Sequence, residues 1–113
     1  MKDDRLYAVH VRESIEKIES YTREGKKTFL ADSKTQDAVV RNLQILAESS
    51  KRLSDGLKAR HAQIDWSSIA GFRNVAVHEY LGIDLGQIWD IVERDLPPLK
   101  KAIADILKQL GVT

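Results

Sequence analysis

Four side chains that can do chemistry stand close together in the sequence, at Arg73, Asn74, His78 and Tyr80. A histidine titrates near neutral pH, so it can accept the proton of a 2′-hydroxyl or give one to a leaving 5′-oxygen. A guanidinium can hold the negative charge that develops on the phosphorus centre. Because RNA carries the 2′-hydroxyl and DNA does not, an arginine and a histidine that meet at one point could cleave RNA without a metal.

The helical positions of these residues bear on whether they can meet. On a regular helix His78 lies one turn after Asn74, and Tyr80 lies nearly in line with Arg73, but Arg73 and His78 are about 140° apart. The two could converge if the helix unwinds near His78, which Gly82 would permit, or if the long arginine side chain reaches around the helix.

An alternative interpretation gives the same residues no catalytic role. Arg73 would pair with Glu48 or Glu79, and His78 would only end a helix. Spacing by itself favours this structural interpretation.

Other familiar chemistries lack their residues. The chain has no cysteine, so it has no disulfide, thiolate zinc site or cysteine nucleophile. His10 and His61 have no acidic or histidine neighbour at metal-ligand spacing, and neither a glycine-rich phosphate loop nor a serine elbow is present. We therefore expect no metal and no cofactor.

Composition places the chain among ordinary folded proteins. It has 113 residues, 42% of them hydrophobic and 31% charged, which predicts a single folded domain over residues 1–113. The 18 basic and 17 acidic side chains balance, unlike the basic excess of proteins that bind duplexes without specificity. Without a membrane span, a signal peptide or cysteines, we expect a cytoplasmic protein with no membrane partner.

Periodicity predicts an all-α fold. Apolar residues recur at intervals of three and four, and β-branched residues nowhere alternate as in a strand. We expect an antiparallel bundle of four to five helices, placed at about residues 3–23, 32–60, 65–80 and 84–110.

The ends of these helices have recognisable signals. Gly25 suits a left-handed C-terminal cap for the first helix, and Asp84 with Gln87 forms a capping box for the fourth. Pro97-Pro98 removes two amide donors, so the last helix should be kinked or broken there.

The motif resembles a known signature. Arg73, His78 and Tyr80 match the Arg-x-x-x-x-His-x-Tyr pattern of HepT-like toxins in the HEPN ribonuclease superfamily, and the likeness covers nearly the whole chain. Three further stretches look like this family: Asp65-Trp66 with Ile69-Ala70-Gly71-Phe72-Arg73-Asn74, Leu46-Ala47-Glu48-Ser49-Ser50-Lys51, and Asp95-Leu96-Pro97-Pro98-Leu99. The departures are small: Ala47 stands where glycine is common, and Val75-Ala76-Val77 is an ordinary apolar filler.

The resemblance implies a HEPN-like helical homodimer that acts as a metal-independent endoribonuclease, the toxin of a type VII-like toxin-antitoxin system. Arg73 and His78 would be catalytic, with Asn74 and Glu48 in supporting roles, and the two Arg-His motifs would line a shared cleft. The partner would be a minimal nucleotidyltransferase antitoxin that transfers AMP from ATP to Tyr80.

Two other functions remain open at this point. The chain could be a non-catalytic helical subunit that binds a nucleotide or the nucleotidyltransferase, or a plain dimerisation domain.

The aromatic and basic residues also have structural interpretations. Tyr80 could be an aromatic packed on Trp89, and Trp66 and Trp89 are better explained as core or dimer anchors than as base-stacking platforms. Basic residues gather at Lys51, Arg52, Lys58 and Arg60. They could form a secondary RNA surface or simply a solvated helix face.

Overall fold

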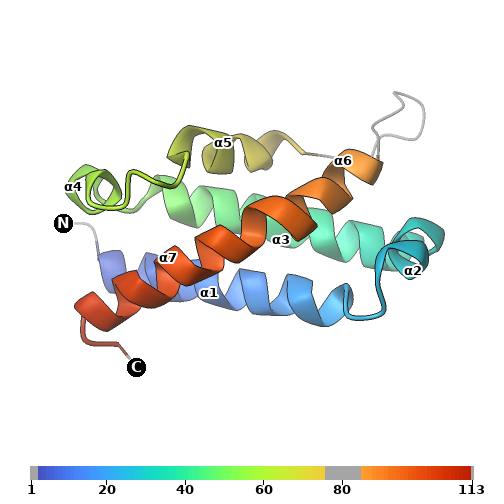
Figure 1. Cartoon of the computed structure of the whole chain (residues 1–113), viewed down its shortest axis with the longest axis horizontal. Helices are drawn as coiled ribbons and strands as arrows, with labels where there is room; N and C mark the ends of the chain where they lie inside the picture. Colours follow the sequence, from blue (N-terminus) through green and yellow to red (C-terminus); the bar gives the residue numbers. More distant parts are fainter. Residues whose placement is uncertain (1–2, 76–84, 113) are drawn as a thin grey trace.

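The computed structural model describes residues 3–75 and 85–112 of the chain, and within them every regular element is helical (Figure 1). The elements in chain order are α1 (Asp4–Tyr21), α2 (Lys26–Ala31), α3 (Ser33–Lys51), α4 (Asp55–Ala59), α5 (Trp66–Gly71), the 3-10 turn η1 (Phe72–Asn74), α6 (Leu85–Asp90), the π-helical turn η3 (Ile91–Asp95) and α7 (Leu96–Gln109). The prediction of an all-α fold is confirmed.

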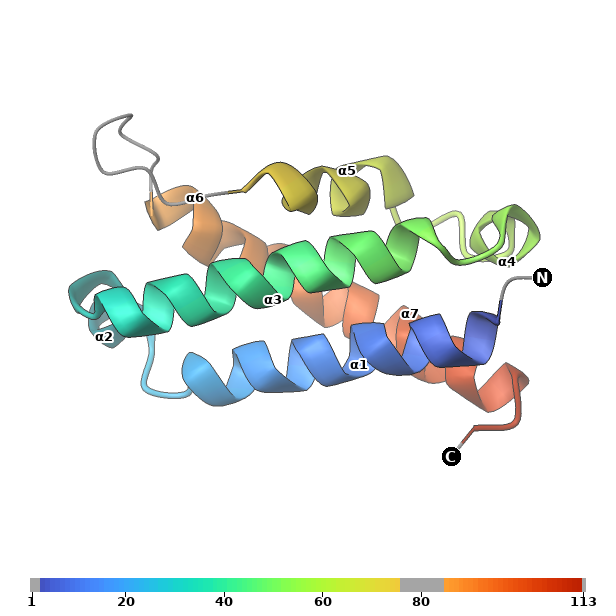
Figure 2. The ribbon, with the colours of Figure 1, turned by 180° about the vertical axis from the view of Figure 1, so that it is seen from behind.

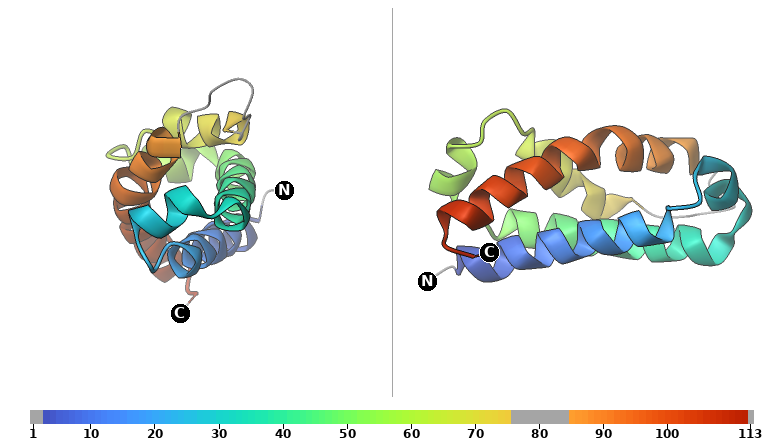
Figure 3. Two further views of the ribbon diagram at one scale, coloured as in Figure 1. Left: turned by 90° about the vertical axis from the view of Figure 1, so that its right-hand side faces the viewer. Right: turned by 60° about the horizontal axis from the view of Figure 1, so that its bottom comes forward.

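The longer elements form an antiparallel bundle, as the sequence predicts. Helix α1, helix α3, the α5–η1 segment and the α6–η3–α7 segment run in alternating directions (Figures 1 and 2). Helix α3 packs against α1, α5 and η1, while α7 packs against α1. Seen from the end, α3 and α7 lie on opposite sides of the bundle (Figure 3). None of the helices described is long and apolar enough to cross a membrane.

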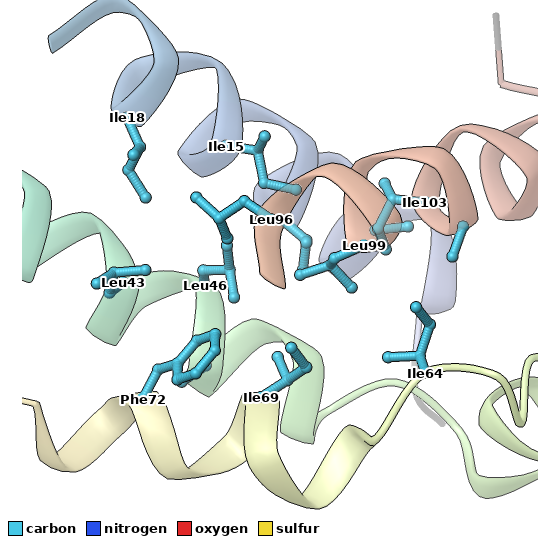
Figure 4. Close-up of a cluster of buried hydrophobic side chains, with 14 of the residues drawn as sticks. Ile15, Ile18, Leu43, Leu46, Ile64, Ile69, Phe72, Leu96, Leu99 and Ile103 are labelled. Atoms are coloured by element: carbon cyan, nitrogen blue, oxygen red, sulfur yellow. The ribbon is translucent and has the colours of Figure 1, made fainter. Parts of the chain in front are cut away.

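The apolar stripes of the helices meet in one core (Figure 4). Side chains from all four segments are buried there: Ile15 and Ile18, Leu43 and Leu46, Ile69 and Phe72, and Leu96, Leu99 and Ile103. Burying one side chain of this size contributes about 1.5–3 kcal/mol, so the stripes fix which face of each helix points inward. The opposite face of α3 is left to polar residues.

Asp3 begins the first helix by accepting hydrogen bonds from the amides of Arg5 and Leu6 at 3.1 and 3.3 Å. The predicted role of Gly25 as its C-cap is wrong, because Thr22 ends the helix and its amide bonds the Ile18 carbonyl. Gly25 does take a positive φ of 95°, but it precedes α2, a short helix that the sequence analysis missed.

The second predicted helix ends at Lys51 rather than near Arg60. The hydroxyl of Ser54 donates to Asp4 Oδ2 at 2.7 Å and its amide donates to Asp4 Oδ1 at 2.8 Å, so the start of α1 holds the chain in a turn. Ser54 then caps α4 by accepting from the Leu57 amide. Leu53 in the turn and Leu57 in α4 are both buried.

The third predicted helix begins where expected but ends early. Asp65 caps α5 by accepting from the amide and hydroxyl of Ser68, and these hydrogen bonds lower the pKa of the Asp65 carboxyl. After η1, Val75 has an extended backbone (φ −69°, ψ 130°), so the expected continuous helix to Tyr80 is wrong. The 140° separation of Arg73 and His78 on such a helix therefore does not apply.

The proline pair breaks the last helix as predicted. Pro97 and Pro98 occupy the first turn of α7, where a missing amide costs least, and the turn before them widens into the π-helical η3. The Leu96 amide accordingly bonds the Ile91 carbonyl five residues back. Asp84 lies outside the described residues, so its capping box stays a prediction.

We predict that Ser54→Ala lowers the free energy of unfolding by about 1–2 kcal/mol, because it removes the hydroxyl that both caps α4 and bonds Asp4. Urea unfolding followed by circular dichroism measures the change. Ser20→Ala is the matched control, since Ser20 is exposed on α1 and should change the value by less than about 0.5 kcal/mol. Equal effects of the two changes would show that the Asp4–Ser54 contact does not stabilise the fold.

Candidate functional site

Arg73 lies in η1, the 3-10 turn that follows α5 along the polar side of α3. Its Nη1 stands 3.7 Å from Oε2 of Glu48, and its side chain is 49% exposed. Asn74 follows at the exposed end of the turn. The structure thus brings Arg73 and Glu48 together across α3 and η1, which both the catalytic and the structural interpretations of the sequence had allowed.

Glu48 forms ion pairs with two arginines. Its second oxygen, Oε1, lies 3.6 Å from Nη2 of Arg52, one turn along α3. Both contacts are longer than a tight charged hydrogen bond, which measures about 2.7–2.9 Å. Exposed ion pairs of this kind contribute about 1 kcal/mol or less to the free energy of folding. Glu48 can therefore orient the Arg73 guanidinium while leaving it free to turn to a phosphate.

Gln44 holds the backbone next to Arg73. Its Nε2 donates to the Val75 carbonyl at 2.7 Å, and Gln44 lies one turn before Glu48 on α3. Val75 is the last described residue before the segment 76–84. Helix α3 therefore orients the side chain of Arg73 loosely through Glu48 and holds the backbone at Val75 firmly through Gln44.

Sequence reasoning did not identify Gln44, because a single glutamine on a helix resembles any solvated residue. The available signal was its position four residues before Glu48, which places both on one face of α3. That signal has meaning only once another segment is known to cover this face.

His78, Glu79 and Tyr80 lie outside the described residues, so their positions relative to Arg73 remain predictions. Among the residues that the structure does describe, no three histidine, aspartate or glutamate side chains gather into a group that could hold a metal ion.

The two tryptophans pack within the chain. Trp89 is buried, its ring centroid lies 5.5 Å from that of Phe29, and its Nε1 donates to Glu93 Oε2 at 3.0 Å. Trp66 is half-buried and donates from Nε1 to the carbonyls of Lys58 and His61. Both serve as core anchors of this chain, in line with one of the roles expected for them; packing of Tyr80 on Trp89 lies outside the described residues.

The basic stretch from Lys51 to Arg60 is divided by the turn between α3 and α4. Lys58 is only 19% exposed, lies 3.9 Å from Asp55 and donates to the Lys51 carbonyl. Arg52 pairs with Glu48 and lies over the ring of Tyr7, 5.8 Å from its centroid. With two of its four cations engaged locally, the stretch has little basis as one RNA surface, and that role stays a prediction.

Comparison with known proteins supplies an independent line of evidence. A family model described as "Ribonuclease HepT-like" matches residues 11–106. "Probable ribonuclease HepT" of Thermococcus cleftensis is 41% identical over 95 residues, which cover 83% of this chain and 86% of that protein. "Gamma-glutamylcyclotransferase and putative RNase" of Methanocaldococcus jannaschii is 37% identical over 110 residues, 96% of this chain but about half of that longer protein (50%). No solved structure matches the chain.

The two polar anchors on α3 should differ in their effect on stability. We predict that Gln44→Ala lowers the free energy of unfolding by about 1–2 kcal/mol, because it leaves the half-buried Val75 carbonyl without its donor. Glu48→Ala, one turn away, should lower it by less than about 1 kcal/mol, since both of its ion pairs are exposed. Urea unfolding of the two variants measures the difference. A larger loss from Glu48→Ala would mean that the ion pairs, and not the backbone contact, hold η1.

Proposed function

The chain belongs to the HepT-like ribonuclease family, and from that membership we propose that it is a metal-independent endoribonuclease toxin that uses Arg73 and His78. One observation of the structure supports the role of Arg73, whereas the role of His78 rests on the motif that resembles the family's. The family match includes η1, where Arg73 presents a half-exposed guanidinium that Glu48 orients through a loose ion pair. Such a group can exchange its carboxylate partner for an RNA phosphate.

The proposed reaction is a transesterification. His78 takes the proton of the 2′-hydroxyl, the 2′-oxygen attacks the adjacent phosphorus, and the 5′-oxygen leaves with a proton from an acid. The products are a 2′,3′-cyclic phosphate and a free 5′-hydroxyl. Arg73 stabilises the charge on the phosphate oxygens as the new bond forms. In the homodimer that we propose, two copies of His78 share one cleft and divide the acid and base roles.

Asn74 and Glu48 are proposed as supporting residues. Asn74 is exposed beside Arg73, where its amide can hold substrate or the histidine. Glu48 is a positioning residue, because it acts on the reaction only through the orientation of Arg73.

Regulation is proposed to act on Tyr80. A minimal nucleotidyltransferase antitoxin would transfer AMP from ATP to the Tyr80 hydroxyl, forming a phosphodiester and releasing pyrophosphate. The added phosphate is negatively charged and can pair with Arg73, so it would occupy the place that an RNA phosphate needs. This proposal rests on the family resemblance of the motif and on the chemistry of the guanidinium.

We predict that Arg73→Ala and His78→Ala each reduce RNA cleavage by at least about 100-fold, while EDTA leaves wild-type cleavage unchanged. Gel analysis of a labelled RNA after incubation measures the cleavage. Arg12→Ala is the matched control, because Arg12 is also a partly exposed arginine paired with a glutamate, Glu16 at 3.5 Å, but lies on α1. Cleavage that EDTA abolishes and magnesium restores would contradict the mechanism, and a wild type that binds RNA without cutting it would favour the non-catalytic subunit.

We predict that Tyr80→Phe still cleaves RNA but escapes neutralisation, because it loses only the oxygen that accepts AMP. Intact mass spectrometry after incubation with ATP and the cognate nucleotidyltransferase should show one or more AMP additions on wild type and none on the variant. Tyr21→Phe, which removes an exposed tyrosine hydroxyl at the end of α1, should be modified like wild type. AMP additions that persist on Tyr80→Phe, or full cleavage by modified wild type, would rule out this switch.

A further inference from the structure

The exposed face of α3 carries two cations that form no close ion pair with a described carboxylate, although Asp32 at the start of α3 attracts Lys34 electrostatically. Lys34 and Arg41 are both exposed, and neither lies within ion-pairing distance of any carboxylate among the described residues. They are seven residues apart, so helical geometry places them on nearly the same line along α3, about 10 Å from each other. A cation that is held in no close ion pair remains available to bind an anionic ligand.

This line leads to the candidate site. Glu48, which orients Arg73, lies another seven residues along α3 from Arg41 and on the same face. Gln44, one turn beyond Arg41, holds the Val75 carbonyl at the end of η1. Arg41 therefore lies one turn along α3 from the residue that holds Val75, and Lys34 lies two turns farther toward α2.

The rest of this face does not oppose an anionic ligand strongly. Asp37 is an exposed carboxylate between the two cations, whereas Ala38 and Ile45 are apolar, with Ile45 37% exposed. The carboxylate of Glu48 is already shared between Arg52 and Arg73. In Figure 2, α3 crosses the front of the molecule between α1 and α5. The described turn η1 meets this face at Gln44 and Glu48, farther along α3 than Lys34 and Arg41.

We propose that Lys34, Arg41 and Arg73 form a cationic track along α3 that binds the phosphate backbone of single-stranded RNA and leads it to the cleavage site. The inference rests on the proposed ribonuclease function and adds the surface that holds the substrate beyond the scissile bond. Phosphate contacts of this kind bind without reading sequence and make the affinity depend on salt.

Binding can be measured apart from cleavage with a fluorescent 12-nucleotide RNA in which every 2′-hydroxyl is methylated, because that probe has no nucleophile. We expect Lys34→Gln/Arg41→Gln to flatten the plot of log Kd against log salt by about 1.4, since each contact with a single strand contributes about 0.7 to the slope. At 0.1 M salt this corresponds to an affinity lower by roughly 10- to 30-fold. Fluorescence anisotropy across a salt series gives both values.

Helix α7 offers a matched control. Lys101 and Lys108 are exposed, are also seven residues apart, and have no described ion-pair partner, but they lie on the helix opposite α3 (Figure 3). Lys101→Gln/Lys108→Gln removes the same charge and should bind the probe like wild type. Arg41→Lys should keep the wild-type salt slope, because it preserves the charge that the track requires.

The outcomes separate this inference from the function on which it rests. Suppose that wild type binds and cleaves RNA but the α3 and α7 double variants both bind the probe like wild type, or both bind it equally more weakly. The track is then overturned while the proposed ribonuclease function stands. If wild type neither cleaves RNA nor binds the probe, the proposed function fails together with it. Light scattering provides a third arm: a change of molecular mass in the α3 variant would make this face an interface between copies and would also overturn the track.

Discussion

The fold depends on the two-sided character of α3. One side of this helix is apolar and buries Leu43 and Leu46 against the other segments, so the core fixes its rotation. Its polar side must then face η1, where Gln44 binds the Val75 carbonyl and Glu48 pairs with Arg73. Because a helix in a close-packed core cannot rotate without losing both sets of contacts, the position of Arg73 is coupled to the packing of the whole bundle.

The two contacts from α3 to η1 differ in exposure and therefore in role. The Gln44 bond is short, half-buried and made to the backbone, so it suits a structural anchor. The Glu48 contacts are long and open to solvent. They orient Arg73, but little free energy is lost when Arg73 leaves Glu48. In the proposed mechanism Arg73 exchanges a carboxylate for a phosphate, and a firm backbone with a weak side-chain pair suits that exchange.

Two interruptions of the predicted helices come from hydrogen-bond requirements that apolar periodicity does not record. The rhythm from Val39 to Leu57 is continuous in sequence and predicts one helix, yet Asp4 captures Ser54 and divides it. Leu53 in the turn and Leu57 in α4 still reach the core, because the turn keeps both side chains on the inner side of the bundle. At Pro97 and Pro98 the missing amides are visible in the sequence itself, and there the predicted break is confirmed.

The sequence by itself determined the helical class, the antiparallel order and the helix starts near residues 32 and 65, because apolar spacing and N-cap chemistry act over a few residues. It also singled out Arg73 and Glu48 as a possible pair. Only the tertiary structure decided that the pair forms, that Gln44 anchors Val75, and that the helix carrying Arg73 ends at Asn74. The two contacts join α3 to a segment far along the chain, since Gln44 and Val75 are 31 residues apart. Contacts between such distant residues depend on how the helices pack, and local periodicity carries no information about that.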